Sequence, residues 1–374
     1  MTQTAAIVGA GIGGLTAALA LAQRGWTVTV HEQAAAWGEV GAGLQLGPNA
    51  LRVLKALKVD LQGFGLAPDR VEMRDGPSGR LQAVVRFGPT AHARYGESYL
   101  QFHRQDLLGA LVAEATKAGV AFKMGTTATP ENPPSADLLV AADGVRSTFR
   151  AALHPDVAPR FTGQVAWRAL VPAERLGPMP KATQLLMGPG LHIVLYPLRN
   201  GTLWNLVAVE ERDTWTEEGW NRPGDATGLR SAFADWASPV PEVLEQVQEP
   251  ILWGLFAHGP LPHWSAGNIA LLGDACHPML PFMAQGAAMA IEDAWVLAEA
   301  VSAEGIPAGL ARYEDLRKPR ATRVQNIAQS NARVYHLRSP VMRRMRGLGL
   351  GMAQRLPGGL LRRFDWLYGA DVTR

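Results

Sequence analysis

Two titratable rings stand in an otherwise apolar stretch of the sequence, GLHIVLYPL at residues 190–198. His192 and Tyr196 are four positions apart, and the side chains of a β-strand alternate between its two faces, so both rings would project from one face. An imidazole can take up a proton near neutral pH, and a phenol can donate one. The pair therefore indicates proton-transfer chemistry, although a buried histidine hydrogen-bonded to its tyrosine neighbour is the alternative.

A glycine-rich turn near the N-terminus predicts a dinucleotide site. Gly9 to Gly14, GAGIGG, fits the G-x-G-x-x-G pattern and stands between an apolar segment and an alanine-rich one. In a strand-turn-helix unit, such a turn brings backbone N–H groups and the positive end of a helix to a pyrophosphate. Glu32 ends the next expected strand, where a carboxylate can hydrogen-bond ribose hydroxyls. The pattern alone does not distinguish NAD from FAD.

Three more segments place polar residues at expected strand or helix ends. Asp143 and Gly144 close one apolar stretch, and Gly273 and Asp274 close another in NIALLGDACHP. The loop after the second stretch leads into an expected helix, whose first N–H groups can meet an anionic or carbonyl oxygen. Arg104 stands at another expected helix start, where a cation opposes the helix dipole. We therefore expect an anionic ligand to hold Arg104.

Together these motifs resemble the single-component FAD-dependent aromatic hydroxylases, which have the p-hydroxybenzoate hydroxylase fold. They occur in that family's order over nearly the whole chain, and GDACHPMLPFMAQGAAMAIEDA is similar to the salicylate, 3-hydroxybenzoate and 6-hydroxynicotinate hydroxylase branch. The resemblance implies a monooxygenase that uses NAD(P)H and O2 to hydroxylate a phenolic or pyridinol aromatic acid through a flavin C4a-hydroperoxide. A flavin-dependent dehydrogenase or reductase, a non-aromatic epoxidase on the same fold, and a non-catalytic flavin-binding partner are the alternatives.

The resemblance also implies bound FAD and transiently bound NADH or NADPH, the latter near the Asp-Gly motif. The residues expected to bind cofactor are Gly9, Ala10, Gly11, Gly13, Gly14, Glu32, Gln33, Gly43, Leu44, Arg104, Asp143, Gly144, Gly273, Asp274, Gln285, Gly286 and Ala287.

The same resemblance places a His-x-x-x-Tyr strand against the substrate's ring substituent. His192 and Tyr196 are therefore the expected catalytic residues, which would remove and relay the proton of a phenol. Gln45, Arg168 and Phe282 are the expected substrate contacts. Arg168 would meet either a substrate carboxylate or only a neighbouring acid, and Gln45 would touch the flavin or the substrate or only pack within its loop.

The order of apolar segments predicts an α/β fold with two lobes and a C-terminal extension. Segments typical of a strand-helix-strand unit open the chain, a β-rich texture occupies its middle, and helical patterns follow. With the resemblance, we expect a Rossmann-like FAD-binding domain of the GR2 type, an inserted β-sheet substrate domain and C-terminal helices. The FAD-binding domain is expected to comprise residues 1–70, 98–160 and 265–330. The substrate domain is expected to comprise residues 71–97 and 161–264, and the C-terminal helices residues 331–374.

Composition restricts the possible partners. The chain of 374 residues has 47% hydrophobic and 18% charged residues, and its formal net charge of +3 gives no reason to expect nucleic-acid binding. Cys276 is the only cysteine, so neither an internal disulfide nor a thiolate metal site can form; we expect no metal and a reducing, cytoplasmic compartment. No apolar stretch is long enough to span a bilayer. A small aromatic substrate, O2 and a second copy of the chain are the expected partners.

Seven arginines and no acidic residue lie between Arg338 and Arg363. We expect a solvated helical face or an oligomer contact there, in preference to an anionic membrane surface.

Overall fold

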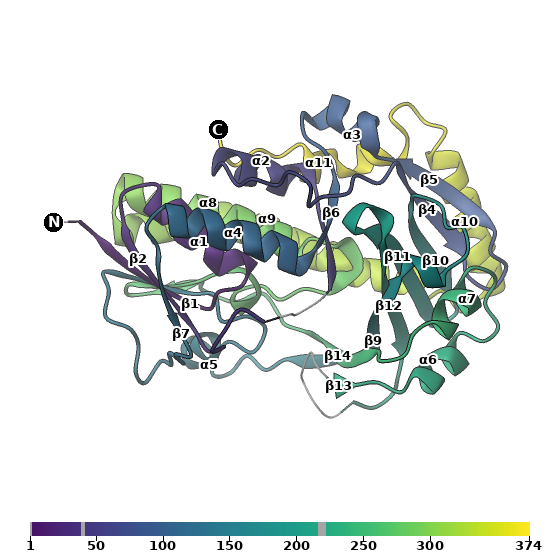
Figure 1. The fold of residues 1–374 in the computed structure, drawn as a ribbon, viewed down its shortest axis with the longest axis horizontal. Coiled ribbons are helices and arrows are strands. Elements are labelled where there is room, and N and C mark those ends of the chain that lie inside the picture. The colour runs from purple at the N-terminus through teal and green to yellow at the C-terminus, as the bar shows by residue number, and fades with distance from the viewer. Residues whose placement is uncertain (1, 39–41, 216–221) are drawn as a thin grey trace.

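The structure is a computed structural model that describes residues 2–38, 42–215 and 222–374 (Figure 1). Its first lobe is built on a six-stranded sheet with the order β15-β16-β8-β1-β2-β7. Neighbouring strands are parallel except for the β15 and β16 pair at one edge. The strands are β1 (Thr4–Val8), β2 (Thr27–Glu32), β7 (Ala121–Met124), β8 (Leu138–Ala141), β15 (Ser265–Ala266) and β16 (Ile269–Leu271).

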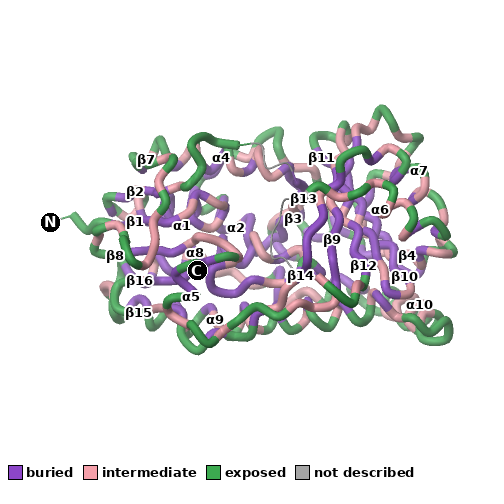
Figure 2. Tube along the Cα trace, turned by 90° about the horizontal axis from the view of Figure 1, so that it is seen from below, coloured by how far each residue is buried: buried purple, intermediate pink, exposed green. Residues whose placement is uncertain are grey.

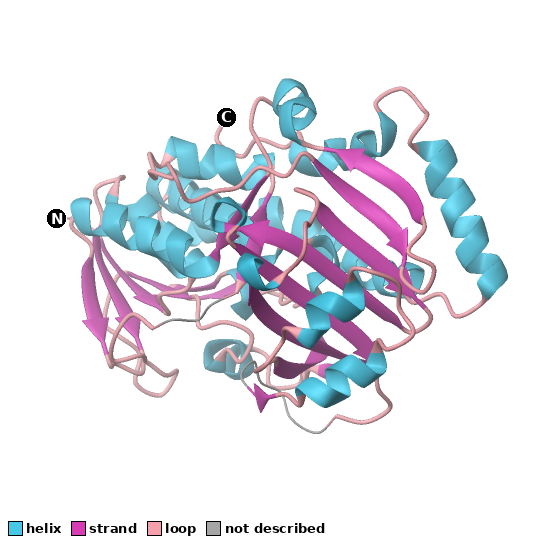
Figure 3. Ribbon diagram, turned by 45° about the vertical axis from the view of Figure 1, so that its right-hand side comes forward, coloured by secondary structure: helices cyan, strands magenta, loops and turns pink. Residues whose placement is uncertain are grey.

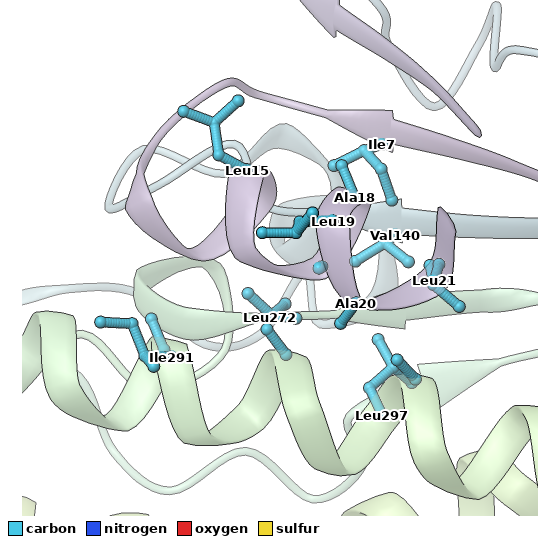
Figure 4. Close-up of a cluster of buried hydrophobic side chains, with 14 of the residues drawn as sticks. Ile7, Leu15, Ala18, Leu19, Ala20, Leu21, Val140, Leu272, Ile291 and Leu297 are labelled. Atoms are coloured by element: carbon cyan, nitrogen blue, oxygen red, sulfur yellow. The ribbon is translucent and has the colours of Figure 1, made fainter. Parts of the chain in front are cut away.

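Helices α1 (Ile12–Ala22), α4 (Arg104–Lys117) and α8 (Gly286–Glu304) lie together beside this sheet (Figures 1 and 3). The alanine-rich helix α1 approaches α8 closely, because a Cβ on Gly13 would lie 2.7 Å from Leu272 and 3.1 Å from Ala290. Figure 4 shows the resulting core, where side chains of α1 and α8 meet those of Ile7 and Val140 from the central strands. This packing fixes the glycine turn that precedes α1. The short helix α5 (Thr148–Leu153) follows β8.

The second lobe is an eight-stranded sheet with the order β13-β14-β9-β12-β11-β10-β4-β5. All neighbours are antiparallel except β10 and β4. Helices α6 (Ala226–Ala232) and α7 (Val240–Glu245) pack on one face, over a core that contains Trp167 and Leu206. The strands are β4 (Arg70–Asp75), β5 (Leu81–Arg86), β9 (Arg160–Pro172), β10 (Thr183–Gly188), β11 (Leu191–Leu198), β12 (Leu203–Glu211), β13 (Arg222–Pro223) and β14 (Ile251–Ala257).

A small two-stranded sheet, β3 (Gly43–Leu46) with β6 (Leu100–His103), connects the lobes. Helix α2 (Pro48–Ala56) follows β3 with a proline in its first turn, and α3 (Gly88–Tyr95) follows β5. Short 3-10 turns complete the described chain: η1 (Ala173–Arg175), η2 (Arg199–Gly201), η3 (Gly273–Ala275), η4 (Pro281–Met283) and η5 (Gly359–Phe364).

Helix α9 (Ile306–Tyr335) packs along α8 and reaches the second lobe, where Ala328 and Ala332 share a core with Ala166 and Trp253. The helix continues past the limit expected at residue 330 and ends at Tyr335. Helices α10 (Pro340–Ala353) and α11 (Asp365–Tyr368) complete the chain, with α10 lying beside β5 (Figure 1).

Five of the seven arginines in the arginine-rich segment are exposed, as expected of a solvated face, whereas Arg343 and Arg346 face the protein. Arg343 and Arg346 lie 3.4 and 3.9 Å from the carboxylate of Asp75, and Arg338 lies 2.5 Å from Glu211. Asp75 ends β4 and Glu211 ends β12, so these ion pairs attach α10 and the segment that precedes it to the eight-stranded sheet.

Buried residues follow the strands and the helix faces between them (Figure 2). In the described ranges no helix is long and apolar enough to cross a membrane. The same ranges contain no group of three or more His, Cys, Asp or Glu side chains arranged to hold a metal ion.

Candidate active site

A cavity of about 360 Å³ opens between the eight-stranded sheet and the first lobe. Apolar side chains from β4, β5, β10 and β14 form much of its wall, and a few polar groups interrupt them. Twelve residues predicted from the sequence line it: Gly43, Leu44, Gln45, Arg104, Arg168, His192, Tyr196, Asp274, Phe282, Gln285, Gly286 and Ala287. The local signals in the sequence thus converge on one cavity.

His192 and Tyr196 stand on the same wall with Val194 between them, as strand alternation predicts. The hydrogen bond between the two rings that the alternative required is absent from the described contacts. His192 Nδ1 instead lies 2.7 Å from Nε2 of His336, just beyond the end of α9. His192 Nε2 has no hydrogen-bond partner among the described residues, which leaves it available to the cavity. The relay between His192 and Tyr196 therefore has no direct contact to support it.

Burial sets the protonation states of these two rings. The pKa of His192 is well below its usual value, because burial disfavours the charged imidazolium and His336 stands close by. Burial raises the pKa of Tyr196 well above the ordinary phenol value, and nearby Arg168 only partly opposes that shift. At neutral pH His192 is thus a neutral proton acceptor, and Tyr196 keeps its hydroxyl proton.

Tyr196 also contacts the loop expected near the flavin. A Cβ on Gly43 would lie 2.5 Å from the Tyr196 hydroxyl and 2.7 Å from Asn205. The Gly43 N–H donates a hydrogen bond of 2.8 Å to Asn205 Oδ1, from the strand next to Tyr196. Glycine at this position therefore lets β3 lie directly against the β11 and β12 strands.

Arg104 and Asp274 both line the cavity, and their opposite charges interact. Burial lowers the pKa of Arg104 and raises the pKa of Asp274, while each side chain favours the charged form of the other. Neither charged group forms a hydrogen bond through its side chain with the described residues. Both therefore remain free to bind a polar ligand.

Arg150 supports the Asp274 segment from behind. Its guanidinium donates to the backbone carbonyls of Asp274 at 3.1 Å, of Ala275 at 3.2 Å and of Val145. The Asp-Gly and Gly-Asp segments, about 130 residues apart in the sequence, are thus connected by one buried side chain.

The first turn of α8 presents free N–H groups to the cavity. Gln285 precedes the helix without a side-chain cap, and no acidic residue occupies its first turn. Gln285 accepts a hydrogen bond of 3.3 Å from Asn49 through Oε1, and its Nε2 has no partner among the described residues. Asn49 is itself held by Glu292 at 2.6 Å. The positive end of α8 is therefore available to an electron-rich group.

The glycine turn before α1 suits a pyrophosphate. A Cβ on Gly14 would lie 2.0 Å from the carbonyl oxygen of Gly9, and one on Gly9 would lie 2.5 Å from that of Ala142, so both positions require glycine. A Cβ on Gly11, in contrast, would meet nothing within 4 Å. The turn is packed on its protein side and open on the other, as close approach of a phosphate demands.

Glu32 is positioned by the same turn. Its carboxylate accepts hydrogen bonds of 2.8 Å from the N–H of Ala10 and 2.9 Å from that of Ala34. Gln33 is exposed and forms no hydrogen bond through its side chain with the described residues. These contacts fix the acid at the end of β2, where a ribose would reach it.

The Asp-Gly motif has a structural role that the sequence did not indicate. Asp143 Oδ2 accepts a hydrogen bond of 2.9 Å from the N–H of Thr148, the first residue of α5, and so supports the helix start that Ser147 caps. Gly144 has a φ of +81°, which a residue with a side chain would adopt only with strain. Gly273 has a φ of +61°, and a Cβ at this position would lie 2.9 Å from Ala290.

The expected substrate contacts all lie on the cavity wall. Phe282 packs edge-on against His192, with 5.0 Å between ring centroids. The Arg168 guanidinium lies 5.0 Å from the Trp253 ring centroid, and its Nε has no partner among the described residues. Gln45 accepts a short hydrogen bond from the Tyr99 hydroxyl.

Comparison with known proteins decides the family. A profile described as an FAD binding domain matches residues 130–328, and one described as an NAD(P)-binding Rossmann-like domain matches residues 7–39. A 3-amino-4-hydroxybenzoate 2-monooxygenase of Streptomyces platensis is 34% identical over 98% of this chain and 96% of the relative. A 6-hydroxynicotinate 3-monooxygenase of Bordetella bronchiseptica is 35% identical over 87% of this chain and 90% of the relative. The chain belongs to the FAD-dependent aromatic hydroxylases.

Solved structures agree with that assignment. A salicylate hydroxylase in complex with substrate covers 100% of this hydroxylase, and 96% of that chain is matched, with a TM-score of 0.81 and 26% identity. The HpxO protein of Klebsiella pneumoniae in complex with FAD and uric acid has the same TM-score and identity over 94% of this chain and 93% of its own. The predicted family, fold class, monooxygenase class and cofactors, FAD with NAD(P)H, are confirmed.

Several wall residues of the hydroxylase escaped the sequence reasoning. Asn331 and Tyr335 reach the cavity from α9, and Phe364 and Tyr368 reach it from the C-terminal segment. Arg52 holds that segment through the carbonyls of Tyr368 at 2.8 Å and Ala370 at 2.6 Å. No local motif marks these side chains, because ordinary helix and turn residues become site residues only when the C-terminal segment folds back over the cavity.

Proposed function

We propose that this hydroxylase adds an oxygen atom from O2 to the ring of a small phenolic or pyridinol aromatic acid, with His192 as the base. The neutral imidazole of His192 on an apolar cavity wall, with Nε2 available to the cavity, carries the proposal. Bound FAD would supply the redox chemistry, which is to accept hydride from NAD(P)H and to activate O2.

Proton removal is the step that the chain's own residues perform. A phenol has a pKa of about 10 in water, and its anion is a much better nucleophile than the neutral ring. His192 Nε2 would take the hydroxyl proton, and the Tyr196 hydroxyl, which burial keeps protonated, would donate a hydrogen bond to the resulting anionic oxygen. Tyr196 thus acts as a hydrogen-bond donor in this proposal, in place of the relay expected from the sequence.

Arg168 is the proposed partner of the substrate carboxylate. Its guanidinium lines the cavity beside Trp253, and its Nε has no partner among the described residues. The relatives are named for hydroxylated benzoates and a hydroxynicotinate, which are acids. Phe282 and Gln45 would bound the ring of the same substrate.

The remaining site residues are proposed to hold FAD. The open side of the turn at Gly11 would face the pyrophosphate, Glu32 would bind the ribose, and Asp274 with Arg104 would bind the polar chain between pyrophosphate and flavin ring. The free N–H groups at Gly286 and Ala287 would meet the flavin's electron-rich edge, next to Gly43 and Leu44. NADH or NADPH would visit this face transiently.

Three further parts of the proposal concern the surroundings of the enzyme. We place O2 as the second substrate because the relatives are monooxygenases and hydroxylases. A cytoplasmic location fits the single, buried Cys276, which can form no internal disulfide. A homodimer would cover the outward apolar side chains of α10, such as Val341, Met345 and Met352.

A flavin-dependent dehydrogenase or reductase would share every FAD contact, so product analysis separates it from a monooxygenase. The purified holoenzyme is incubated with hydroxybenzoates, aminohydroxybenzoates and hydroxypyridine carboxylates, and NAD(P)H oxidation, O2 uptake and hydroxylated product are measured together. We expect at least one acid of the panel to give hydroxylated product in an amount that matches the NAD(P)H oxidised. NAD(P)H oxidation without hydroxylated product from any acid in the panel would contradict the proposal.

The base is tested by His192→Asn, with His92→Asn at an exposed position of α3 as the matched control. Loss of a general base typically costs about 10²- to 10⁴-fold in the step that it assists. We expect flavin reduction by NAD(P)H to stay near the wild-type rate while most consumed O2 appears as hydrogen peroxide. Product per NAD(P)H at the wild-type level in His192→Asn would show that His192 is not the base.

A further inference from the structure

Behind His192, a line of hydrogen-bonded side chains leads from the cavity to the surface. His192 Nδ1 lies 2.7 Å from His336 Nε2, and His336 Nδ1 lies 3.2 Å from Glu211 Oε1. Arg338 donates to the other carboxylate oxygen of Glu211 at 2.5 Å. The side chains of the two histidines are only about 2% exposed, whereas that of Glu211 is 31% exposed. The line therefore begins at the cavity wall and ends in contact with solvent.

Three elements bring these groups together. His192 belongs to β11, Glu211 ends β12, and His336 caps the C-terminus of α9. The N–H of Gly190, in the turn before β11, donates a hydrogen bond of 3.2 Å to the carbonyl of His336. A Cβ on Gly190 would lie 3.1 Å from Arg338 and 3.2 Å from Glu211, so the absence of a side chain there leaves room for their ion pair.

The imidazole of His192 is held in a fixed plane. Phe282 and Tyr335 pack against it nearly edge-on, at centroid distances of 5.0 and 5.3 Å. This packing leaves the two ring nitrogens as the ring's polar contacts, one toward His336 and one toward the cavity. Gln164 also faces His336: its amide nitrogen lies 3.2 Å from His336 Nδ1, and its amide oxygen has no partner among the described residues. With the amide turned by 180°, that oxygen accepts a hydrogen bond from a protonated Nδ1.

A proton taken up by His192 cannot stay there at low cost. The ring is buried beside a second histidine, and both conditions lower its pKa. Burial also lowers the pKa of His336, but Glu211 opposes that effect, while Arg338 reinforces it. Positive charge is therefore better tolerated as the proton moves away from the cavity and toward the Glu211 carboxylate.

We propose that His336 and Glu211 form a proton outlet for the cavity, which rests on the proposed role of His192 as the base. The substrate O–H bond breaks as an N–H bond forms at His192 Nε2. The proton on His192 Nδ1 passes to His336 Nε2, and the proton on His336 Nδ1 passes to the Glu211 carboxylate and then to water. No electrons are transferred, and reprotonation of the product along the same line restores both rings.

The outlet is tested with oxidised holoenzyme, without NAD(P)H, by mixing it with 3-amino-4-hydroxybenzoate in weakly buffered solution that contains a pH-indicator dye. Wild-type enzyme should release a proton as the acid binds. His336→Gln can keep a hydrogen bond to His192 but cannot pass a proton on, so we expect unchanged affinity and proton release that is at least about tenfold slower. Glu211→Gln should slow release in the same direction.

Glu210→Gln is the matched control, because its carboxylate pairs with Arg212, which lies over Trp167 in the core on the opposite face of β12. It should release protons at the wild-type rate. His336→Ala should lose fast release and regain it when imidazole is added to the solution. A merely structural role for His336 predicts no rescue by imidazole and equal effects of the glutamine and alanine variants.

Proton release from His336→Gln at the wild-type rate would overturn the outlet. Normal release from His192→Asn would instead overturn the proposed base, so the two failures can be told apart. A second measurement needs no substrate: ¹⁵N-histidine spectra of the holoenzyme should show a proton shared between His192 and His336 that is lost in both His192→Asn and His336→Gln. Absence of that signal in the wild-type enzyme would also overturn the outlet.

Discussion

Replacement of Arg317 by methionine should destabilise the fold strongly, because this residue neutralises two buried acids. Glu292 and Asp293 are fully buried on α8, and Arg317 of α9 lies 2.5 Å from the first and 2.7 Å from the second. Without Arg317, Glu292 keeps Arg320 at 2.7 Å, but Asp293 keeps only His277 at 2.5 Å among the described residues. Removal of one partner of a buried ion pair costs about 3–5 kcal/mol. Methionine fills much of the volume that Arg317 vacates, so the loss of unfolding free energy reflects removal of the charge more than a cavity.

The matched control is Arg312→Met on the same helix. Arg312 pairs with Glu304 at 2.5 Å, but the side chains are 47% and 35% exposed, and such surface pairs contribute about 0.2–1 kcal/mol. The free energy of unfolding in urea, measured at pH 7.5 with excess FAD, should therefore fall several times further for Arg317→Met. Equal losses for the two variants would refute the reasoning.

The pH dependence of Arg317→Met gives a second check. Burial alone would raise the pKa of Asp293, and His277 with Arg317 holds it below its usual value. In the wild type, the stability from Asp293 is present above the unfolded pKa of about 3.9 and is lost as pH falls through the lower folded pKa. In the variant the folded pKa rises, so protonation relieves the buried charge and the gap to the wild type should narrow between pH 7 and pH 5.

Three further predictions concern the cofactor and the histidines. Gly14→Ala should abolish retention of FAD through purification, because its Cβ would lie 2.0 Å from the Gly9 carbonyl oxygen. The control Gly109→Ala in α4, whose Cβ would meet nothing within 4 Å, should retain FAD. Equal flavin content in the two variants would contradict this prediction. Asp274→Asn should raise the Kd for FAD by about 10- to 100-fold in flavin fluorescence titrations, and an unchanged Kd would remove Asp274 from the site. Burial lowers the pKa of His192 and lowers that of His258 to about 4. The stability that each neutral ring contributes to the fold is therefore present above pH 6.5. It should be lost as pH falls, by up to about 1.4 kcal/mol per pH unit for each ring. Urea unfolding between pH 7 and pH 5 measures that slope, which should be shallower in His192→Asn and unchanged in His92→Asn.

The sequence predicts the parts of the site that depend on local geometry. The glycine turn at Gly9 needs only a strand and a helix next to each other in the chain, and the placement of His192 and Tyr196 on one wall follows from strand alternation. Arg104 is recognisable because a cation at a helix start is unfavourable without a ligand. These signals lie within a few residues of the feature that they describe.

Contacts between distant segments could not be predicted in the same way. His336 is 144 residues from His192, and their hydrogen bond depends on how the end of α9 meets β11. Arg150 connects two motifs that the sequence shows only separately, and Tyr368 reaches the cavity because the C-terminal segment folds back. Such contacts are set by the packing of whole elements, which no short pattern encodes.

Oxygen labelling tests the central claim most directly. The wild-type holoenzyme is supplied with NAD(P)H, the acid that gives product and oxygen-18 gas, and the product is analysed by mass spectrometry. A monooxygenase built around this cavity should place a single oxygen-18 atom on the aromatic ring for each NAD(P)H oxidised. A product whose new oxygen comes from water, or cofactor oxidation with no labelled product, would contradict the account.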